Sequence, residues 1–494
     1  MNKFFSPDLV PVFGGIEMAI LLPAIILLIT SLLALLAAAA WRSNHQFASR
    51  ICFLTTFVGL SLSLLSISGM GQDAGIFQDF LDLNHGFKGI FSIIILGSLL
   101  ALGIVYIQDQ LQKFLPEFYA LVLFSMLGMF FLIFSKHMML TFIALELMSL
   151  SVYVLVSLKR TSPASAEAGF KYFILGGLAA CFILYGMVLL FGATGTFDLN
   201  TISQSLSQLS NSTLTLAKVG GVLILCGLLF KVGAFPFHSW VPDVYQGAPA
   251  SLSGWMSTIV KMASFVLLVK FSMAVFFTPS LIDFFTILIS ISAVLTMFAG
   301  NLLALQQFQL KRLLAYSSVA HTGYLLVAVI AAGSNPKSLI TLFIYLATYT
   351  VLSLASFGVL AIWENNRSMD LTLDHIAGIG RSEKLPGLFF ALASLGLAGI
   401  PLTAGFIGKF LLINEAMSGR QAVLCILLVL ASLIGAYYYL RVFYYMYLRP
   451  SFERMPLGPS SSISLLTPVM FLSAINIFMG VAPQIIVTWL TSKL

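Results

Sequence analysis

Long apolar runs, separated by short polar connections, fill the chain from residue 15 onward. A helix needs about 20 mostly apolar residues to cross the roughly 30 Å of hydrocarbon in a bilayer. The runs have that length and lack the alternation of a transmembrane β-strand. The pattern therefore predicts an all-α polytopic membrane protein, a single integral membrane domain over 1–494 with about 14 transmembrane helices. The predicted spans are 15–41, 51–70, 89–108, 117–135, 137–158, 169–192, 216–236, 251–277, 280–304, 313–333, 338–363, 386–415, 421–448 and 462–491.

Glycine and proline interrupt the seventh and twelfth of these spans. The seventh runs into AFPFHSWVPD, in which Pro236 and Pro242 lack amide donors, and the twelfth contains LAGIPLTAGFIGKF. Broken helices persist at membrane depth only where protein or water satisfies the freed carbonyls. Paired breaks in two halves of a membrane protein are typical of inverted repeats around an ion site. We expect a first five-helix repeat at 117–277, a second at 280–448 and a last transmembrane helix at 462–491.

Charge is sparse in the spans and concentrated in the connections. Of all residues, 59% are hydrophobic and 9% are charged, which excludes an ordinary soluble domain. Thirteen lysines and arginines fall in the odd-numbered connections and eight in the even-numbered ones. The positive-inside rule then predicts that the odd-numbered connections are cytoplasmic and that both termini lie on the other side. The sequence has no basic cluster for nucleic acid, so the net charge of +7 reflects membrane topology.

Five charged side chains lie within or just inside the spans. At about 3 kcal/mol each, they would cost on the order of 15 kcal/mol if left unpaired, as much as the net stability of a typical domain, about 5–15 kcal/mol. They must therefore pair, become hydrated or lose their charge. A structural ion pair is one explanation, and for Lys171, near the start of its span, extension of the side chain to the surface is another. The five residues are Glu146, Lys171, Lys231, Lys261 and Lys409.

A buried lysine beside a carboxylate can load and release a proton. Burial disfavours an ammonium group, whereas a nearby negative charge favours it. A change in the charge of Glu146 or of a neighbouring lysine would then hold or expel the proton. His321, in LLAYSSVAHTGYLLVAV, stands among hydroxyl-bearing residues, which fits either a hydrated path or a histidine satisfied in the core. Because no phosphate-binding loop or metal-ligand spacing is present, we expect no cofactor bound by this chain.

Three motifs resemble a known family. They are FKVGAFPFHSWVPDVYQGAPA (230–250), GNLLALQQFQLKRLLAYSSVAHTGYLL (300–326) and LAGIPLTAGFIGKF (397–410), and Glu146 lies in a fourth matching segment, ALELMSLSVY. Together they resemble the antiporter-like subunits of proton-pumping NADH-quinone oxidoreductase, respiratory complex I, over nearly the whole chain. Lys409 favours the N-type branch of that family, because the M-type branch has glutamate at this position.

The resemblance implies a function, partners and site residues. The chain would be a membrane-arm subunit that translocates protons across the bacterial inner membrane, with both termini periplasmic. NADH and quinone would be used by the redox subunits, which it would meet through other membrane-arm subunits in the lipid bilayer. The residues implied are Glu146 as the coupling carboxylate, Lys231 as the central protonatable group, Lys261 as the relay, Lys409 as the terminal group, and Lys171, His238 and His321 as relay candidates.

Two other functions fit the same sequence. A cation/proton antiporter subunit of a multisubunit complex shares the pattern of lysines and glutamate. A passive membrane scaffold would use buried charges only to fix helix register. Replacing Lys231 by alanine separates the scaffold from a pump, because a scaffold would stay assembled and active. The N-like motifs favour the complex I subunit.

Overall fold

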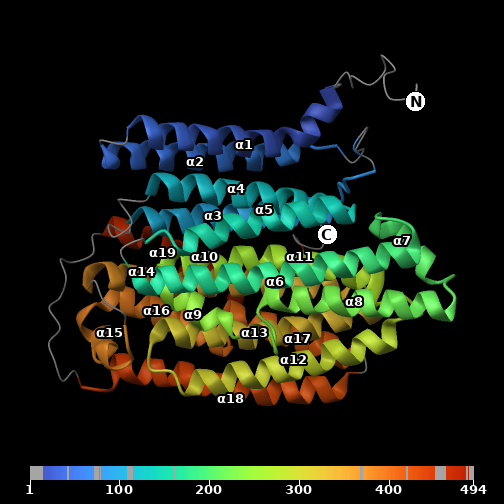
Figure 1. Cartoon of the computed structure of the whole chain (residues 1–494). Coiled ribbons are helices and arrows are strands. Elements are labelled where there is room, and N and C mark those ends of the chain that lie inside the picture. Colours follow the sequence, from blue (N-terminus) through green and yellow to red (C-terminus); the bar gives the residue numbers. More distant parts are fainter. Residues whose placement is uncertain are drawn as a thin grey trace.

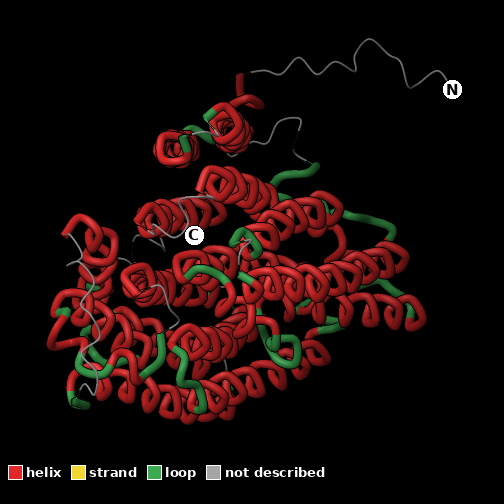
Figure 2. Tube along the Cα trace, turned by 60° about the vertical axis from the view of Figure 1, so that its left-hand side comes forward, coloured by secondary structure: helices red, strands yellow, loops and turns green. Residues whose placement is uncertain are grey.

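The computed structural model describes residues 15–41, 44–71, 77, 79–107, 115–159, 162–335, 337–367, 371–418, 421–450, 463–485 and 488. Figure 2 shows helices joined by loops throughout this described part of the chain, with no strand. Each predicted span corresponds to helix, and the prediction of an all-α polytopic membrane protein is confirmed. Both termini, which the sequence places on the periplasmic side, lie outside the described residues.

The first six spans are single helices. These are α1 (Gly15–Ala40), α2 (His45–Ser68), α3 (His85–Ile107), α4 (Leu115–Phe134), α5 (Met138–Val156) and α6 (Pro163–Thr194). Spans nine to eleven, thirteen and fourteen are also single helices. These are α12 (Ile282–Leu305), α13 (Leu310–Ser334), α14 (Ser338–Arg367), α18 (Ala422–Tyr447) and α19 (Ile463–Val481).

The remaining three spans are composite. The seventh comprises α8 (Asn211–Val232) and α9 (Trp240–Gly247). The eighth comprises α10 (Ala250–Trp255), η4 (Met256–Val260), α11 (Lys261–Phe271) and η5 (Ser272–Phe276). The twelfth comprises α16 (Lys384–Ala398) and α17 (Ala404–Ser418). Among the described residues, 12 helices are long and apolar enough to cross a membrane. The shorter apolar helices at Lys384–Ala398 and Leu466–Val481 belong to the broken twelfth span and to the last one.

Three short helices were not predicted, because they lie in connections. They are α7 (Leu199–Leu206), η6 (Asp374–Ile376) and α15 (Ile379–Ser382). In α7 the apolar side chains of Leu199, Ile202 and Leu206 are buried, so this helix packs flat against the end of the bundle. With 8 residues, α7 is too short to span a membrane.

The bundle has a buried centre and a lipid-compatible periphery. In its most apolar window, α13 is 94% buried, whereas α1 and α2 are each 33% buried. Figure 1 shows α1 and α2 together at one edge, next to α4, and α18 at the opposite edge. Helices α9, α12, α14 and α17 all pack against α13. Polar groups on α13 are therefore shielded from lipid and meet both halves of the chain.

The seventh span breaks at a glycine rather than at a proline. Helix α8 ends at Val232, and Gly233 has a φ of 73°, a left-handed conformation that costs a glycine little. Turns follow over residues 235–239, which include Pro236. Pro242 lies inside the first turn of α9, where a missing amide hydrogen breaks no helical bond. The predicted break is confirmed, but Pro242 does not cause it.

The twelfth span breaks in a similar way. Helix α16 ends at Ala398, Gly399 has a φ of 89°, and α17 begins at Ala404. The amide of Ala404 donates to Oδ1 of Asn476 on α19 at 3.0 Å, which satisfies one free donor at the start of α17. The break is therefore supported by a polar side chain from another helix, as membrane burial requires.

Candidate functional site

Lys231 and Glu146 meet between two helices of the first half. Lys231 lies in the last turn of α8, where the helix dipole favours a positive charge, and is 7% exposed. Its Nζ donates to Oγ of Ser149 at 2.7 Å and to the hydroxyl of Tyr153 at 3.1 Å, both on α5. Oε1 of Glu146 lies 3.8 Å from the same Nζ, beyond hydrogen-bond distance. The pair is therefore an ion pair that small movements can tighten or release.

Lys261 is held without a carboxylate among the described residues. It is the first residue of α11, directly after the π-helical turn η4, a feature frequent at functional sites. Its Nζ donates to the carbonyl of Ser318 at 2.7 Å, to Oγ of Ser318 at 2.5 Å and to Oγ1 of Thr322 at 3.0 Å. These contacts use all three donors of an ammonium. The ring of Tyr349 lies 5.3 Å from Nζ and adds a cation–π contact.

The environments of these two lysines adjoin each other. A cavity of about 10 Å³ is lined by both Lys231 and Lys261, and such a volume has room for about one water molecule. The hydroxyl of Thr322, which accepts from Lys261, also donates to the carbonyl of Val232 at 3.0 Å. That carbonyl is one of those freed by the break after α8. A small cavity therefore lies at this break, and both lysines line it.

His321 continues the polar contacts on the buried helix α13. Its Nδ1 lies 2.9 Å from the hydroxyl of Tyr345, and its Nε2 lies 3.4 Å from the hydroxyl of Tyr439. The Tyr439 hydroxyl also contacts Oγ of Ser317. A histidine that contacts a hydroxyl at each ring nitrogen can accept a proton on one side and donate on the other.

Lys409 lies at the second break. Its Nζ donates to the carbonyls of Leu397 at 3.0 Å and Ala398 at 2.8 Å, which the end of α16 leaves free, and to Oγ of Ser432 at 3.0 Å. The same Nζ lies 5.7 Å from the ring of Tyr324 on α13. Lys409 thus donates to the free carbonyls of the broken helix and contacts α13, the helix that carries His321.

The structure therefore brings five of the predicted residues into one buried polar chain. It runs from the Glu146–Lys231 ion pair, through the cavity to Lys261, along α13 past His321, and to the second break. The members are Glu146 on α5, Lys231 on α8, Lys261 on α11, His321 on α13 and Lys409 on α17.

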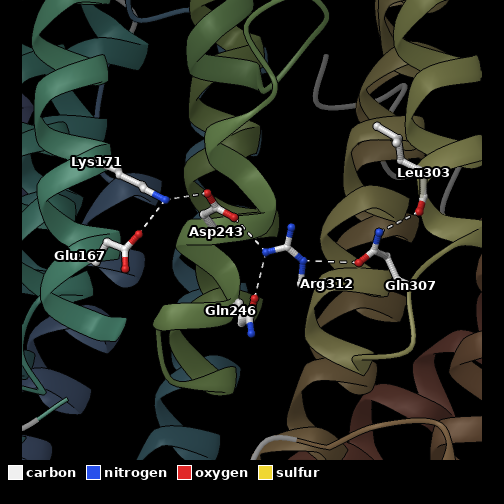
Figure 3. Close-up of polar contacts among 7 residues, drawn as sticks. All are labelled: Glu167, Lys171, Asp243, Gln246, Leu303, Gln307 and Arg312. Carbon is white, nitrogen blue, oxygen red and sulfur yellow. Dashed lines mark hydrogen bonds and ion pairs between the residues drawn. The ribbon is translucent and has the colours of Figure 1, made fainter. Parts of the chain in front are cut away.

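Lys171 and His238 have no described contact with the five residues of the buried polar chain. The side chain of Lys171 is 43% exposed and pairs with Glu167 at 2.8 Å and Asp243 at 3.1 Å (Figure 3). The ring of His238 stacks on Phe235 with 5.5 Å between centroids, and its Nδ1 is buried without a hydrogen bond to a described residue. Their roles as relays stay predictions.

A polar network that the sequence reasoning missed joins α6, α9 and α13 (Figure 3). Arg312 donates to Asp243 at 2.8 Å, to Gln246 at 2.9 Å and to Gln307 at 3.4 Å. The Asp243 carboxylate thus accepts hydrogen bonds from both Arg312 and Lys171, which compensates for its partial burial. The position of Asp243 directly after the break, in VPD, was the available signal.

Three lysines that the sequence places at the surface are largely buried. Nζ of Lys311 lies 3.1 Å from Oε1 of Glu364 and donates to the carbonyl of Ala248 at 3.2 Å. Lys88 and Lys270 donate to carbonyls at helix ends, at 2.5–3.1 Å. The prediction was wrong for these residues because free carbonyls at helix termini attract ammonium groups inward. Glu364 is thus a buried acid, whereas the side chain of Glu146, expected to be buried, is 23% exposed.

A membrane-helix bundle with two broken spans, each adjoining a buried lysine of one polar chain, defines the class of antiporter-like membrane proteins. Sequence comparison agrees with this class. The chain belongs to the NADH:quinone oxidoreductase/Mrp antiporter family, whose model matches residues 135–435.

Individual relatives specify the branch of the family. The chain is 37% identical to NADH-quinone oxidoreductase subunit N of Trichlorobacter lovleyi, over 89% of this chain and 90% of that one. It is 34% identical to subunit N of Myxococcus xanthus, over 95% and 96%. The predicted resemblance to the N-type subunits is confirmed.

Solved structures share the fold. A chain of respiratory complex I from Thermus thermophilus, solved with bound aureothin, matches with a TM-score of 0.77 at 31% identity, over 94% of this chain and 98% of that one. A chain of the Mrp complex from Dietzia sp. DQ12-45-1b matches with a TM-score of 0.78 at 18% identity, over 96% and 97%. At that identity the Mrp match shows a common fold alone.

Proposed function

We propose that this chain is a membrane-arm subunit of NADH-quinone oxidoreductase that translocates protons across a bacterial inner membrane. Partner redox subunits would reduce quinone with NADH, and other membrane-arm subunits would connect them to this chain. The observation that carries the proposal is the buried polar chain from Glu146 to Lys409. Termini on the periplasmic side and cofactors held by partner subunits belong to the same proposal.

The first step concerns Glu146 and Lys231. An ionised Glu146 favours the charged form of Lys231, and compensation of the Glu146 charge removes that preference. The side chain of Glu146 is 23% exposed, so a charged group of an adjoining subunit can approach it from outside this chain. Lys231 would then release its proton toward Lys261, across the cavity that both line, and become a neutral amine.

The second step passes the proton to Lys261. The lone pair of a neutral Lys261 takes the proton, and the three oxygen acceptors from Ser318 and Thr322 surround the ammonium that forms. Each transfer leaves the donor amine neutral and the acceptor charged, so the net charge of the buried chain is unchanged. Moving one charge along the path, instead of adding a second one, avoids the cost of a further buried charge.

The last steps cross α13 toward the second break. His321 accepts a proton at one ring nitrogen and releases one at the other, between Tyr345 and Tyr439. Lys409 holds the proton next to the carbonyls of α16 before its release. Lys171 and His238 would serve in entrance or exit, outside the central chain.

The same proposal divides the chain into two inverted five-helix repeats, 117–277 and 280–448, followed by a last helix in 462–491. One broken span in each repeat supports this division. The two repeats place their lysines differently, because Lys231 precedes its break and Lys409 follows its own.

A cation/proton antiporter subunit is the second candidate function. The shared fold with the Mrp chain favours it. Identities of 34–37% to N-type subunits, against 18% to the Mrp chain, favour the complex I subunit.

Replacement of Lys231 by alanine tests the proposal. We expect inner membranes with Lys231→Ala to contain assembled complex but to lose NADH-driven proton pumping and quinone reduction. The matched control is Lys218→Ala, because Lys218 lies on the same helix and contacts only the ring of Phe284 among described contacts, at 5.8 Å. Normal assembly, turnover and pumping with Lys231→Ala would make this lysine structural and favour a scaffold.

A further inference from the structure

A second cavity lies outside the buried polar chain, at the end of the bundle formed by the even-numbered connections. It is a groove of about 570 Å³, within the usual size range of ligand sites. Its walls come from α3, α7, α11, η5, α14 and the connection between α4 and α5. None of the residues proposed for proton transfer lines this groove.

The groove has an apolar floor and a basic mouth. Ile90, Val266, Val269 and Phe343 line it and are buried. Lys136, Lys337 and the largely buried Lys270 also line it, and the one acid among its lining residues is Asp82, so lysines outnumber acids three to one in the lining. This arrangement matches a molecule with a hydrocarbon body and an anionic head.

The three ammonium groups have donors left for such a head. Lys270 donates to the carbonyls of Leu132 at 3.1 Å and Ser135 at 2.5 Å, and it keeps a third N–H. Lys136 and Lys337 form no ion pair with any described residue. Lysines without a counter-ion at the mouth of a cavity are favourable partners for a phosphate group.

The position of the groove along the helices fits the headgroup layer. Lys136 stands between the ends of α4 and α5, and Lys337 stands just before α14. Backbone bridges between Leu81 and Ser135 and between His137 and Asp198 flank Lys136 and fix its connection. Lys136 and Lys337 therefore lie where spanning helices end, and the apolar residues of the floor lie within such helices.

We propose that this groove binds one anionic phospholipid. Its phosphate lies beside Lys136, Lys337 and the remaining donor of Lys270, and an acyl chain covers the buried floor. A free phosphate ion would leave the apolar floor exposed, and a zwitterionic lipid would leave the excess positive charge without a partner. The site would hold the ends of α4, α11 and α14 together.

The test measures phospholipid retained by the purified complex. Wild-type and variant complexes in detergent are titrated with phosphatidylglycerol or phosphatidylcholine, and bound lipid is counted by native mass spectrometry. In Lys136→Ala/Lys337→Ala we expect phosphatidylglycerol at this site to bind about 30-fold more weakly, since each lysine near the membrane surface contributes about five- to sixfold. Lys270 stays unchanged because it supports α4.

Two controls make the result specific. Lys218→Ala removes a lysine that does not line the groove, and it should retain phosphatidylglycerol as the wild type does. Ala274→Phe, at a lining residue, narrows the groove without changing its charge and should also displace the lipid. Excess inorganic phosphate should not displace it.

Unchanged phosphatidylglycerol binding in the double variant would overturn the proposal. Equal retention of phosphatidylcholine, displacement by inorganic phosphate alone, or a crosslink from Lys136 into a neighbouring subunit with no lipid bound would each overturn it as well. None of these results would bear on proton translocation, because the groove shares no residue with the buried polar chain.

Discussion

The three lysines of the buried polar chain differ in what surrounds their ammonium groups. Lys231 has two hydroxyl partners and the carboxylate of Glu146 at 3.8 Å, whereas Lys261 and Lys409 have hydroxyls, carbonyls and an aromatic ring but no carboxylate among the described residues. Electrostatic control by a carboxylate therefore acts first at Lys231. The other lysines respond to the charge that Lys231 gains or loses.

A change at Glu146 tests this difference. Glu146→Gln keeps the shape of the side chain and removes its charge, so Lys231 loses its ion-pair partner. We expect quinone-coupled activity to fall by roughly tenfold, equivalent to about 1.4 kcal/mol. If the two groups act as a pair, Glu146→Gln/Lys231→Met should be no slower than Lys231→Met. Activities that multiply independently would contradict the pairing.

The sequence predicted the central residues because each is a charged residue in an otherwise apolar run. Lys231, Lys261 and Lys409 stand in apolar runs, and burial leaves few explanations for them. Lys311 and Glu364 lie at the ends of their spans, where a charged side chain is ordinary. Their burial depends on how α13, α14 and the connection after α9 meet, which no local pattern reports.

At the scale of helices, each break is closed by side chains. The indole N–H of Trp240 donates to the carbonyl of Phe230 at 3.1 Å, and Thr322 donates to that of Val232. At the second break Lys409 does the same for two carbonyls of α16. Proline and glycine in the sequence predicted that these helices break, but only the fold determines which side chains donate to the carbonyls that each break leaves free.

Gly399 gives an element-scale prediction. Gly399→Ala places a residue at a φ of 89°, and its Cβ would lie 2.8 Å from Cδ of Lys409. The left-handed conformation alone costs roughly 1–2 kcal/mol, so we expect less assembled complex and lower pumping. Gly177→Ala on α6 is the control, since its Cβ meets no heavy atom within 4 Å. Equal amounts of active complex in both variants would show that this break tolerates change.

The Lys311–Glu364 pair gives a second prediction, because it joins α13 and α14 beneath the connection after α9. Lys311→Met leaves a buried carboxylate without this partner, at a cost of about 3–5 kcal/mol. Thermal dissociation of the complex should shift to lower temperature. Lys311→Met/Glu364→Leu should recover much of the loss, and a double variant as unstable as the single one would argue against a simple ion pair.

At the scale of the whole molecule, the order of spans was predictable from hydropathy, and the buried polar chain was not. Lipid forces each long apolar run into a helix, so the runs alone define the spans. The path from Glu146 to Lys409 uses residues from α5, α8, α11, α13 and α17, which packing around α13 brings together. Tyr349 and Tyr439 enter the path only through that packing.

The central claim is that protons cross this chain through Lys261, the middle of the path. The most direct test is the number of protons translocated per NADH oxidised by assembled complex in vesicles carrying Lys261→Met. We predict a lower ratio or a loss of quinone-coupled turnover, while NADH oxidation with a water-soluble electron acceptor is unchanged. A wild-type ratio at wild-type turnover would contradict the account, because protons would then cross without Lys261.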